Sequence, residues 1–134
     1  MLSELRPGQS VELLQELHIL TREGRLNQDS RRKLKQVYHL FNFIEPLLTE
    51  LSVQGCGPTL ADHGAGKSYL GFILYDLYFK ALKAGHIYGI ETRPELVQKS
   101  RALAARSHSL RRLSSAWKSS ASASRARSPK VAAI

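Results

Sequence analysis

The sequence predicts an α/β fold in which a helical N-terminal region precedes a strand–helix–strand–helix unit and a disordered basic tail. Three observations lead to this prediction. Residues 1–54 repeat apolar side chains at helical spacing, residues 55–106 alternate short apolar runs with helical segments around a glycine-rich loop, and residues 107–134 contain 9 Ser and 6 Ala. Strands that alternate with helices form parallel sheets with right-handed crossovers. A chain of 134 residues has room for one domain at most.

Two helices are expected in the N-terminal region. The first follows Ser10, which is a suitable N-cap, and carries an apolar stripe made of Val11, Leu13, Leu14, Leu17 and Leu20. Asp29 or Ser30 can cap the second helix, whose stripe recurs at steps of three and four residues and consists of Leu34, Val37, Phe41, Ile44, Leu48 and Leu51.

Two features modify the second helix. Pro46 falls within the apolar stripe and predicts a kink or a break near Glu45, because proline removes a helical hydrogen bond. A group of cations lies near the start of the helix, and we interpret it as a solvated face more readily than as a contact to a phosphate or an acidic partner: Arg31, Arg32, Lys33 and Lys35.

The first strand and helix of the α/β unit come next. Residues 59–63 form a short, partly apolar run closed by a glycine, which is typical of a buried parallel strand. A helix is predicted over residues 69–84, with Gly85 in the C-cap position. Its inward face is expected to carry Leu70, Ile73, Leu74, Leu77, Ala81 and Leu82.

A second strand and helix complete the unit. Residues 86–91 predict the strand, and Thr92 with Glu95 three residues later predicts a capping box at the start of the helix. The apolar face of this helix is expected to hold Leu96, Val97 and Leu103. The order of elements therefore places Glu91 at the same sheet edge as the glycine loop.

The charge is unevenly distributed along the chain. The net charge is +9, yet residues 1–95 contain 11 Lys and Arg and all 11 acidic residues, so the excess lies in residues 96–134. A basic tail can attract nucleic acid, and Trp117 could stack on a base, which leaves a nucleic-acid-binding protein as an alternative function. We expect only weak contact, because the cations are scattered among Ser and Ala.

Several classes of protein are excluded by composition. Cys56 is the single cysteine, so neither an intramolecular disulfide nor a thiolate zinc cluster can form, and we expect no metal site. The sequence has no run near the ~18 apolar residues of a membrane span, and its first residues do not resemble a secretory signal. We expect a soluble, cytoplasmic protein without a membrane partner.

The glycine loop is the one constellation with clear chemistry. Asp62, Gly64 and Gly66 follow the first strand, and Glu91 ends the second. Glycines let a ligand approach the main chain, and an acid at the next strand end can accept hydrogen bonds from ribose hydroxyls. A mere tight turn is the simpler alternative. We interpret His63 as a packing residue more readily than as a catalyst. We likewise interpret Lys67 as a solvated residue more readily than as a phosphate ligand.

Two nucleotide-binding motifs fit the loop poorly. A Walker A loop would require glycine where Ala61 stands, so Gly66-Lys67-Ser68 is explained by chance, although a degenerate P-loop stays an alternative. A dinucleotide fingerprint would require glycine in place of Tyr69.

The loop resembles the first motif of the class I S-adenosylmethionine-dependent methyltransferases. Residues 60–71, Leu-Ala-Asp-His-Gly-Ala-Gly-Lys-Ser-Tyr-Leu-Gly, are similar to the branch whose motif reads Asp-x-Gly-x-Gly-Lys-Gly-Tyr-Leu, with Ser68 in place of a glycine. The resemblance implies a Rossmann-like sheet, S-adenosylmethionine as cofactor, and a site made of Asp62, Gly64, Ala65, Gly66 and Glu91. Gly64 and Gly66 would lie against the methionine part, Asp62 would organise the loop or bind the amino group through water, and Glu91 would hold the ribose.

The resemblance also implies that part of the fold is missing. The family's sheet has more strands than the two predicted here, so we expect an incomplete sheet and a truncated or frame-shifted product continued in unrelated sequence after Arg106. Such a chain should be weakly active or inactive. No catalytic residue can be named, and the methyl acceptor could be RNA, protein or a small molecule.

Overall fold

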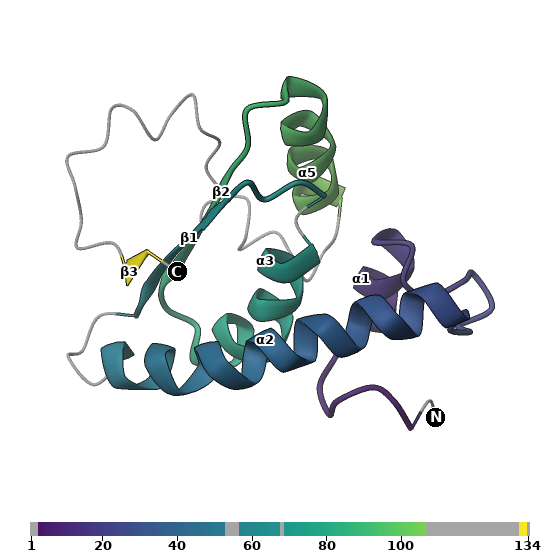
Figure 1. Cartoon of the computed structure of the whole chain (residues 1–134), viewed down its shortest axis with the longest axis horizontal. Coiled ribbons are helices and arrows are strands. Elements are labelled where there is room, and N and C mark those ends of the chain that lie inside the picture. The colour runs from purple at the N-terminus through teal and green to yellow at the C-terminus, as the bar shows by residue number, and fades with distance from the viewer. Residues whose placement is uncertain (1–2, 53–56, 68, 107–131, 134) are drawn as a thin grey trace.

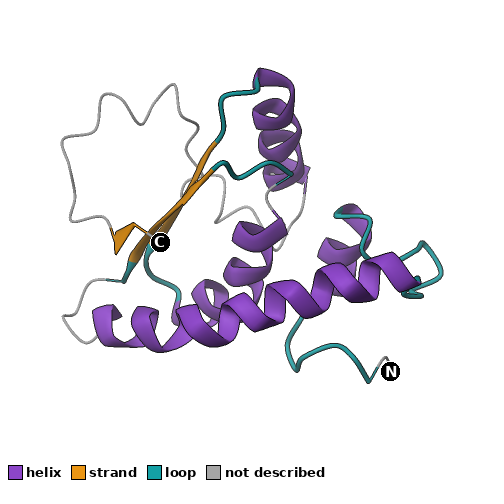
Figure 2. Cartoon of the chain, viewed as in Figure 1, coloured by secondary structure: helices purple, strands orange, loops and turns teal. Residues whose placement is uncertain are grey.

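The computed structural model describes residues 3–52, 57–67, 69–106 and 132–133. Helices and strands alternate from β1 onwards, after a helical N-terminal region (Figures 1 and 2). Within the described residues, no helix combines the length and the apolar character needed to cross a membrane. The predicted disorder of the tail concerns residues 107–131, which lie outside the described residues.

The first helix, α1, spans Val11–Glu16 and is shorter than its predicted stripe. Ser10 is the N-cap as expected, because its hydroxyl accepts a hydrogen bond from the Leu13 backbone N–H at 3.2 Å. The chain leaves the helix at His18, whose φ is +56°. Four of the five stripe residues are buried, while Val11 is 47% exposed.

The second helix, α2, spans Gln28–Ser52 as one element. Neither predicted residue caps it: Asn27 does, since its side-chain oxygen accepts from the Ser30 backbone N–H at 2.8 Å. The expected break at Pro46 is also wrong. Pro46 lies on the exposed side of the helix, and the buried stripe residues Ile44 and Leu48 on either side of it hold the helix against the core. Only Leu51 of the stripe is exposed.

The predicted strands form a parallel pair, β1 (Thr59–His63) and β2 (His86–Ile90). The register joins Thr59 to His86 and His63 to Ile90, so both strands end at one edge of the sheet. A two-residue strand, β3 (Ala132–Ala133), pairs with β1 on its other side and gives the order β2-β1-β3. This third strand corrects our expectation that the tail adds none, because parallel pairing requires only backbone groups.

The helix after β1 is continuous but contains a π-helical turn. It consists of α3 (Tyr69–Leu74), the π-helical turn η1 (Tyr75–Phe79) and α4 (Lys80–Leu82). The extra residue of a π-turn rotates the following side chains around the axis. Ala81 and Leu82, which follow the π-turn and were predicted to face inward, are therefore exposed, whereas Phe72, Tyr75 and Phe79 are buried.

The two ends of this helix contact other parts of the fold. Asp76 is buried, accepts from the Ser10 backbone N–H at 2.8 Å and pairs with Lys80 Nζ at 2.6 Å, which ties α1 to the sheet unit. The left-handed residue that ends α4 is Lys83, and not Gly85 as predicted. Gly85 is instead needed for close approach, since a Cβ there would lie 2.6 Å from the Pro58 carbonyl oxygen.

The last helix, α5, spans Pro94–Arg106. Pro94 occupies its first position, a favourable place for proline, so Arg93 and not Thr92 precedes the helix. The predicted capping box is wrong because the Thr92 hydroxyl lies 3.5 Å from Glu91 Oε1. The buried face of α5 consists of Ser100, Leu103 and Ala104, while Leu96 and Val97 are half-buried.

One hydrophobic core joins the helical region to the α/β unit. The fully buried side chains come from both: Leu13, Leu14, Ile19, Leu34, Leu48, Phe72, Ile73, Leu74 and Ile87. In Figure 1, α3 lies between α2 and the sheet, in agreement with its contacts to α2 and β2. This packing holds the start of α3, and with it the glycine loop, at the end of β1.

Candidate functional site

The candidate site lies where β1 and β2 end side by side. The loop after β1 folds over the end of β2: the backbone N–H groups of Gly64 and Ala65 both donate to the Ile90 carbonyl oxygen, at 2.8 and 3.1 Å. These two N–H groups are therefore used within the protein.

The structure brings the loop and the acid of β2 together. The Gly66 backbone N–H donates to Glu91 Oε2 at 2.9 Å, across 25 positions of sequence. This contact follows from the parallel register, because His63 and Ile90 are partners and the residues after them leave the sheet at the same edge. The sequence-predicted neighbours Gly66 and Glu91 are thus direct hydrogen-bond partners.

Glu91 is held by a dense set of donors. Its side chain is 7% exposed, and its Oε1 accepts from the backbone N–H groups of Thr92 at 2.9 Å and Arg93 at 3.1 Å. The Arg93 guanidinium adds a two-point contact, with Nε 3.1 Å from Oε1 and one terminal nitrogen 3.0 Å from Oε2. Hydrogen bonds from the Arg93 side chain and backbone, together with that from Gly66, lower the pKa of Glu91 to about 2. The carboxylate is therefore ionised at neutral pH.

Arg93 was not among the residues predicted from sequence. Its guanidinium is exposed apart from the contact to Glu91, with 59% of the side chain accessible. A signal for it exists in hindsight: an arginine two residues after an acid at a strand end can fold back on that acid before the next helix begins. The sequence reasoning assigned residues 92–95 to helix capping and so overlooked it.

Asp62 differs from Glu91 in its surroundings. It is half-buried near the end of β1, beside a small cavity of about 100 Å³ that Leu60 and Leu70 also line. Burial raises the pKa of its carboxyl group, with a smaller opposing effect of His63. Within the described part of the chain, no donor is hydrogen-bonded to this side chain. Asp62 is thus a carboxyl group with unused acceptor capacity next to the loop.

The two glycines satisfy a backbone requirement and leave space above the loop. Gly64 and Gly66 have φ of +68° and +58°, values that favour glycine. A Cβ on Gly64 would meet nothing within 4 Å, and one on Gly66 would approach no closer than 3.9 Å to Arg93 or Gly64. Nothing in the described protein fills the space that these missing side chains leave.

The remaining sequence candidates lie outside this cluster. His63 and Lys67 are exposed, and Cys56 and Ser68 fall outside the described residues. Tyr75 and Phe79 belong to the core, and the Tyr78 hydroxyl lies 3.0 Å from Ser52 Oγ. The candidate residues Asp62, Gly64, Ala65, Gly66 and Glu91 therefore lie at one edge of the sheet, where Arg93 also contacts Glu91.

A parallel strand pair, a glycine turn between strand and helix, and an acid at the neighbouring strand end form the arrangement at which many α/β domains bind nucleotide-like ligands. The sequence profile of a family described as a methyltransferase domain matches residues 32–133, which include all of these features, and the chain belongs to this family. The match does not stop at Arg106 but extends over the basic segment. No curated protein and no solved structure matches the chain.

Proposed function

We propose that the methyltransferase domain uses S-adenosylmethionine, bound at the glycine loop between β1 and α3. The contact between the Gly66 backbone and the Glu91 carboxylate carries this proposal, because it places an ionised acid beside a turn with open space above its glycines. The groups present fit the cofactor in charge and in hydrogen-bonding capacity. Glu91 offers acceptors for ribose hydroxyls, and Asp62 offers an acceptor for an ammonium group.

The donors around Glu91 suggest how a ribose would be accommodated. Backbone N–H groups of Gly66, Thr92 and Arg93 belong to the fold and orient the carboxylate. The Arg93 guanidinium is the exposed member of the set and can move without disturbing the core. We infer that ribose hydroxyls take the place of this guanidinium, so that Glu91 exchanges one pair of donors for another and stays fully hydrogen-bonded.

Asp62 has a complementary role in this proposal. A half-buried carboxyl with a raised pKa gains stability when a cation comes close, because the charged form is then compensated. The amino group of the cofactor, near the end of β1, would supply that charge. When bound, the cofactor provides a methyl group on a positively charged sulfur, and the chain's own residues bind and orient it.

Calorimetric titration with S-adenosylmethionine and with its demethylated product tests the proposal. Glu91→Gln should weaken binding about tenfold, since a carboxylate that accepts from hydroxyl groups becomes an amide with half the acceptors. Glu95→Gln is the matched control, because Glu95 is an exposed carboxylate four residues away in the first turn of α5 and should bind as the unmodified chain does. Binding of ATP with magnesium in place of S-adenosylmethionine would favour the P-loop alternative and refute the assignment.

A further inference from the structure

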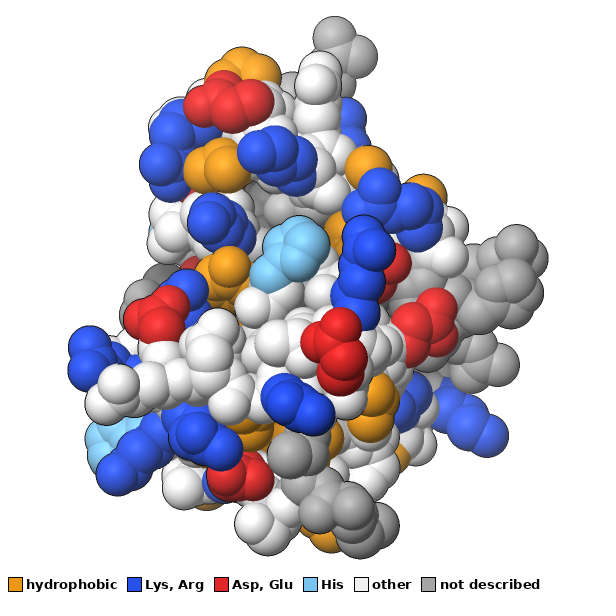
Figure 3. Space-filling view, turned by 90° about the vertical axis from the view of Figure 1, so that its right-hand side faces the viewer, with side chains coloured by type: hydrophobic (Ala, Val, Ile, Leu, Met, Phe, Trp, Pro, Cys, Tyr) orange, Lys and Arg blue, Asp and Glu red, His pale blue; other side chains and the backbone are white. Residues whose placement is uncertain are grey.

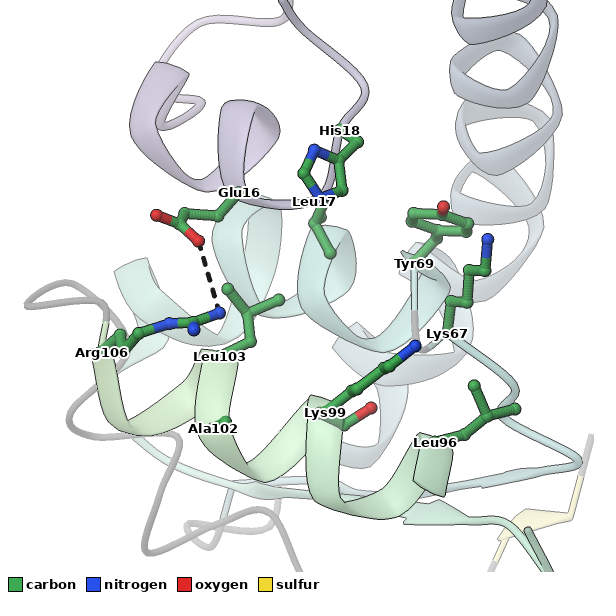
Figure 4. A pocket seen from close by; sticks show the side chains of 11 residues that line it. Glu16, Leu17, His18, Lys67, Tyr69, Leu96, Lys99, Ala102, Leu103 and Arg106 are labelled. Atoms are coloured by element: carbon green, nitrogen blue, oxygen red, sulfur yellow. Dashed lines mark ion pairs between the residues drawn. The ribbon is translucent and has the colours of Figure 1, made fainter. Parts of the chain in front are cut away.

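A second cavity lies between the end of α1, the start of α3 and one face of α5. Its volume is about 320 Å³, at the lower end of the range for ligand pockets. In Figure 4, Glu16 approaches the cavity from the end of α1 and His18 from the residues just after it. Lys67 and Tyr69 approach from the loop and the start of α3, and Lys99 approaches from α5. Lys67 follows Gly66 directly, so the cavity begins where the glycine loop ends.

The cavity concentrates positive charge. Lys67, Lys99 and Arg106 line it against one carboxylate, that of Glu16, which lies 3.6 Å from Arg106. Among the described residues, neither Lys67 nor Lys99 forms an ion pair, and Figure 4 shows the Lys99 amino group reaching across the cavity in the direction of Lys67 and Tyr69. Figure 3 shows Lys and Arg side chains around a hollow on the face that carries α1 and α5. Like charges placed together repel, and an anion between them would relieve this repulsion.

The walls of the cavity supply flat and apolar surface beside this charge. The side chains of Leu17, Leu96 and Leu103 line it, and the rings of His18 and Tyr69 stand on the same side in Figure 4. Rings next to cations are the combination that proteins use to bind nucleotides, since the ring stacks on the base while the cation neutralises the phosphate. A simple anion would contact the lysines alone, whereas a nucleotide would also contact the two rings, of which the Tyr69 ring already has its centroid 5.9 Å from Lys33 Nζ.

We infer that this cavity binds the phosphate of a nucleotide between Lys67 and Lys99, with the base against His18 and Tyr69. Two sources supply a nucleotide with this chemistry: a free mononucleotide, or one unit of a single-stranded nucleic acid. The inference goes beyond the proposed function and does not depend on it, because none of the residues lining this cavity belongs to the cofactor site. Its location next to Gly66 would bring the bound nucleotide close to the glycine loop.

The first test compares AMP, adenosine and inorganic phosphate by calorimetric titration of the full chain. AMP should bind at least about tenfold more tightly than adenosine, because adenosine lacks the charge that the lysines recognise. This comparison needs no variant and so does not depend on how substitutions fold. Equal affinity for AMP and adenosine would overturn the inference, and phosphate binding as tightly as AMP would overturn the assigned role of His18 and Tyr69.

Variants locate the binding. Lys67→Gln and Lys99→Gln should each weaken AMP binding about tenfold. Lys83→Gln is the matched control: it also removes one positive charge, but Lys83 caps the end of α4, far from the cavity, so AMP binding should not change. Glu16→Gln should strengthen binding about twofold to fivefold by releasing Arg106 from its partner. A gain of affinity cannot come from unfolding. Equal losses for Lys67→Gln and Lys83→Gln would show a general charge effect and refute the site.

Salt dependence separates the two sources. If single-stranded nucleic acid occupies the cavity, an RNA oligonucleotide should compete with AMP. The plot of log affinity for the oligonucleotide against log salt has a negative slope, and this slope should become shallower by about 0.7 for each lysine replaced. If free nucleotides occupy it, AMP should bind unchanged in the presence of the oligonucleotide. The basic tail contributes the same background to every variant, so the comparison of slopes isolates the cavity.

Discussion

Replacing Gly64 by alanine tests whether this glycine serves only the turn or also leaves space for the cofactor. Gly64 has a φ of +68°, and a Cβ there would meet nothing within 4 Å. An L-residue in this left-handed conformation is strained by about 1 to 2 kcal/mol, with no added steric clash. The free energy of unfolding should therefore fall by about that amount, which corresponds to a decrease in Tm of about 4 to 7 °C for a domain of this size.

Gly24 provides a matched control for this prediction. It has a φ of +75°, also meets nothing within 4 Å at its Cβ position, and donates its N–H to the Thr21 carbonyl oxygen at 2.9 Å, much as Gly64 donates to Ile90. Gly24→Ala and Gly64→Ala should therefore unfold at similar temperatures in a thermal melt. Only Gly64→Ala should lose affinity for S-adenosylmethionine in a calorimetric titration, by tenfold or more, because its methyl group occupies the space proposed for the cofactor.

The result that would refute this reasoning is specific. If both alanine variants bind S-adenosylmethionine as tightly as the unmodified chain, the glycine at position 64 serves only the turn. The space above the loop would then have no function in binding. A loss of binding in both variants would instead indicate a general effect of destabilisation on the site.

Two further predictions concern the charged groups of the fold. Arg93→Gln should raise the pKa of Glu91 from about 2 in the direction of its usual 4.5, because the guanidinium hydrogen bonds are lost. The pKa should stay below 4.5, because the Gly66 N–H still donates to the carboxylate. A carbon-13 NMR titration of the Glu91 carboxyl measures this change. Because the pKa of Glu91 is lowered in the folded state, this carboxylate stabilises the fold fully above about pH 4.5, and the stabilisation is lost as the pH falls to about 2. Between these two pH values, the free energy of unfolding should therefore fall less in Arg93→Gln than in the unmodified chain. Asp76→Asn should lower the free energy of unfolding by about 1 to 3 kcal/mol in urea, because a buried acceptor of two donors is changed. Asp29→Asn, which alters an exposed pair of the same spacing, should leave stability nearly unchanged, and equal effects would contradict the role of burial.

The strands and the glycine loop could be predicted because their signals are local. Residues 59–63 and 86–90 combine apolar side chains with adjacent glycines, and parallel pairing follows from the helix that separates them. The proximity of Gly66 and Glu91 could also be predicted from the sequence, because two adjacent parallel strands end at one edge of the sheet. Its chemical consequence, an ionised and oriented carboxylate, depended on the neighbouring Arg93 and required the structure.

The errors arose where the fold overrides a regular pattern. A 3.6-residue period applied to residues 69–84 cannot anticipate the π-turn at Tyr75–Phe79, which moves Leu82 to the surface. The N-cap of α2 was misplaced by two residues or more, because Asn27, Asp29 and Ser30 are all capable of capping and only the backbone path decides among them. Proline at position 46 was tolerated for a tertiary reason, namely that its side of the helix faces solvent.

The distribution of charge illustrates the same limit in a different way. Residues 1–95 sum to zero, and the excess of positive charge begins with α5, which carries Lys99 and Arg106. Folding nevertheless gathers Lys67 from the loop with Lys99 and Arg106 from α5, and a spacing of seven residues sets these last two on one face of that helix. The net charge of a segment thus says little about a cavity, because packing selects which charges meet. Residues 1–106 carry 14 Lys and Arg against 11 acidic residues, and packing places three of these cations around one pocket at the end of the glycine loop.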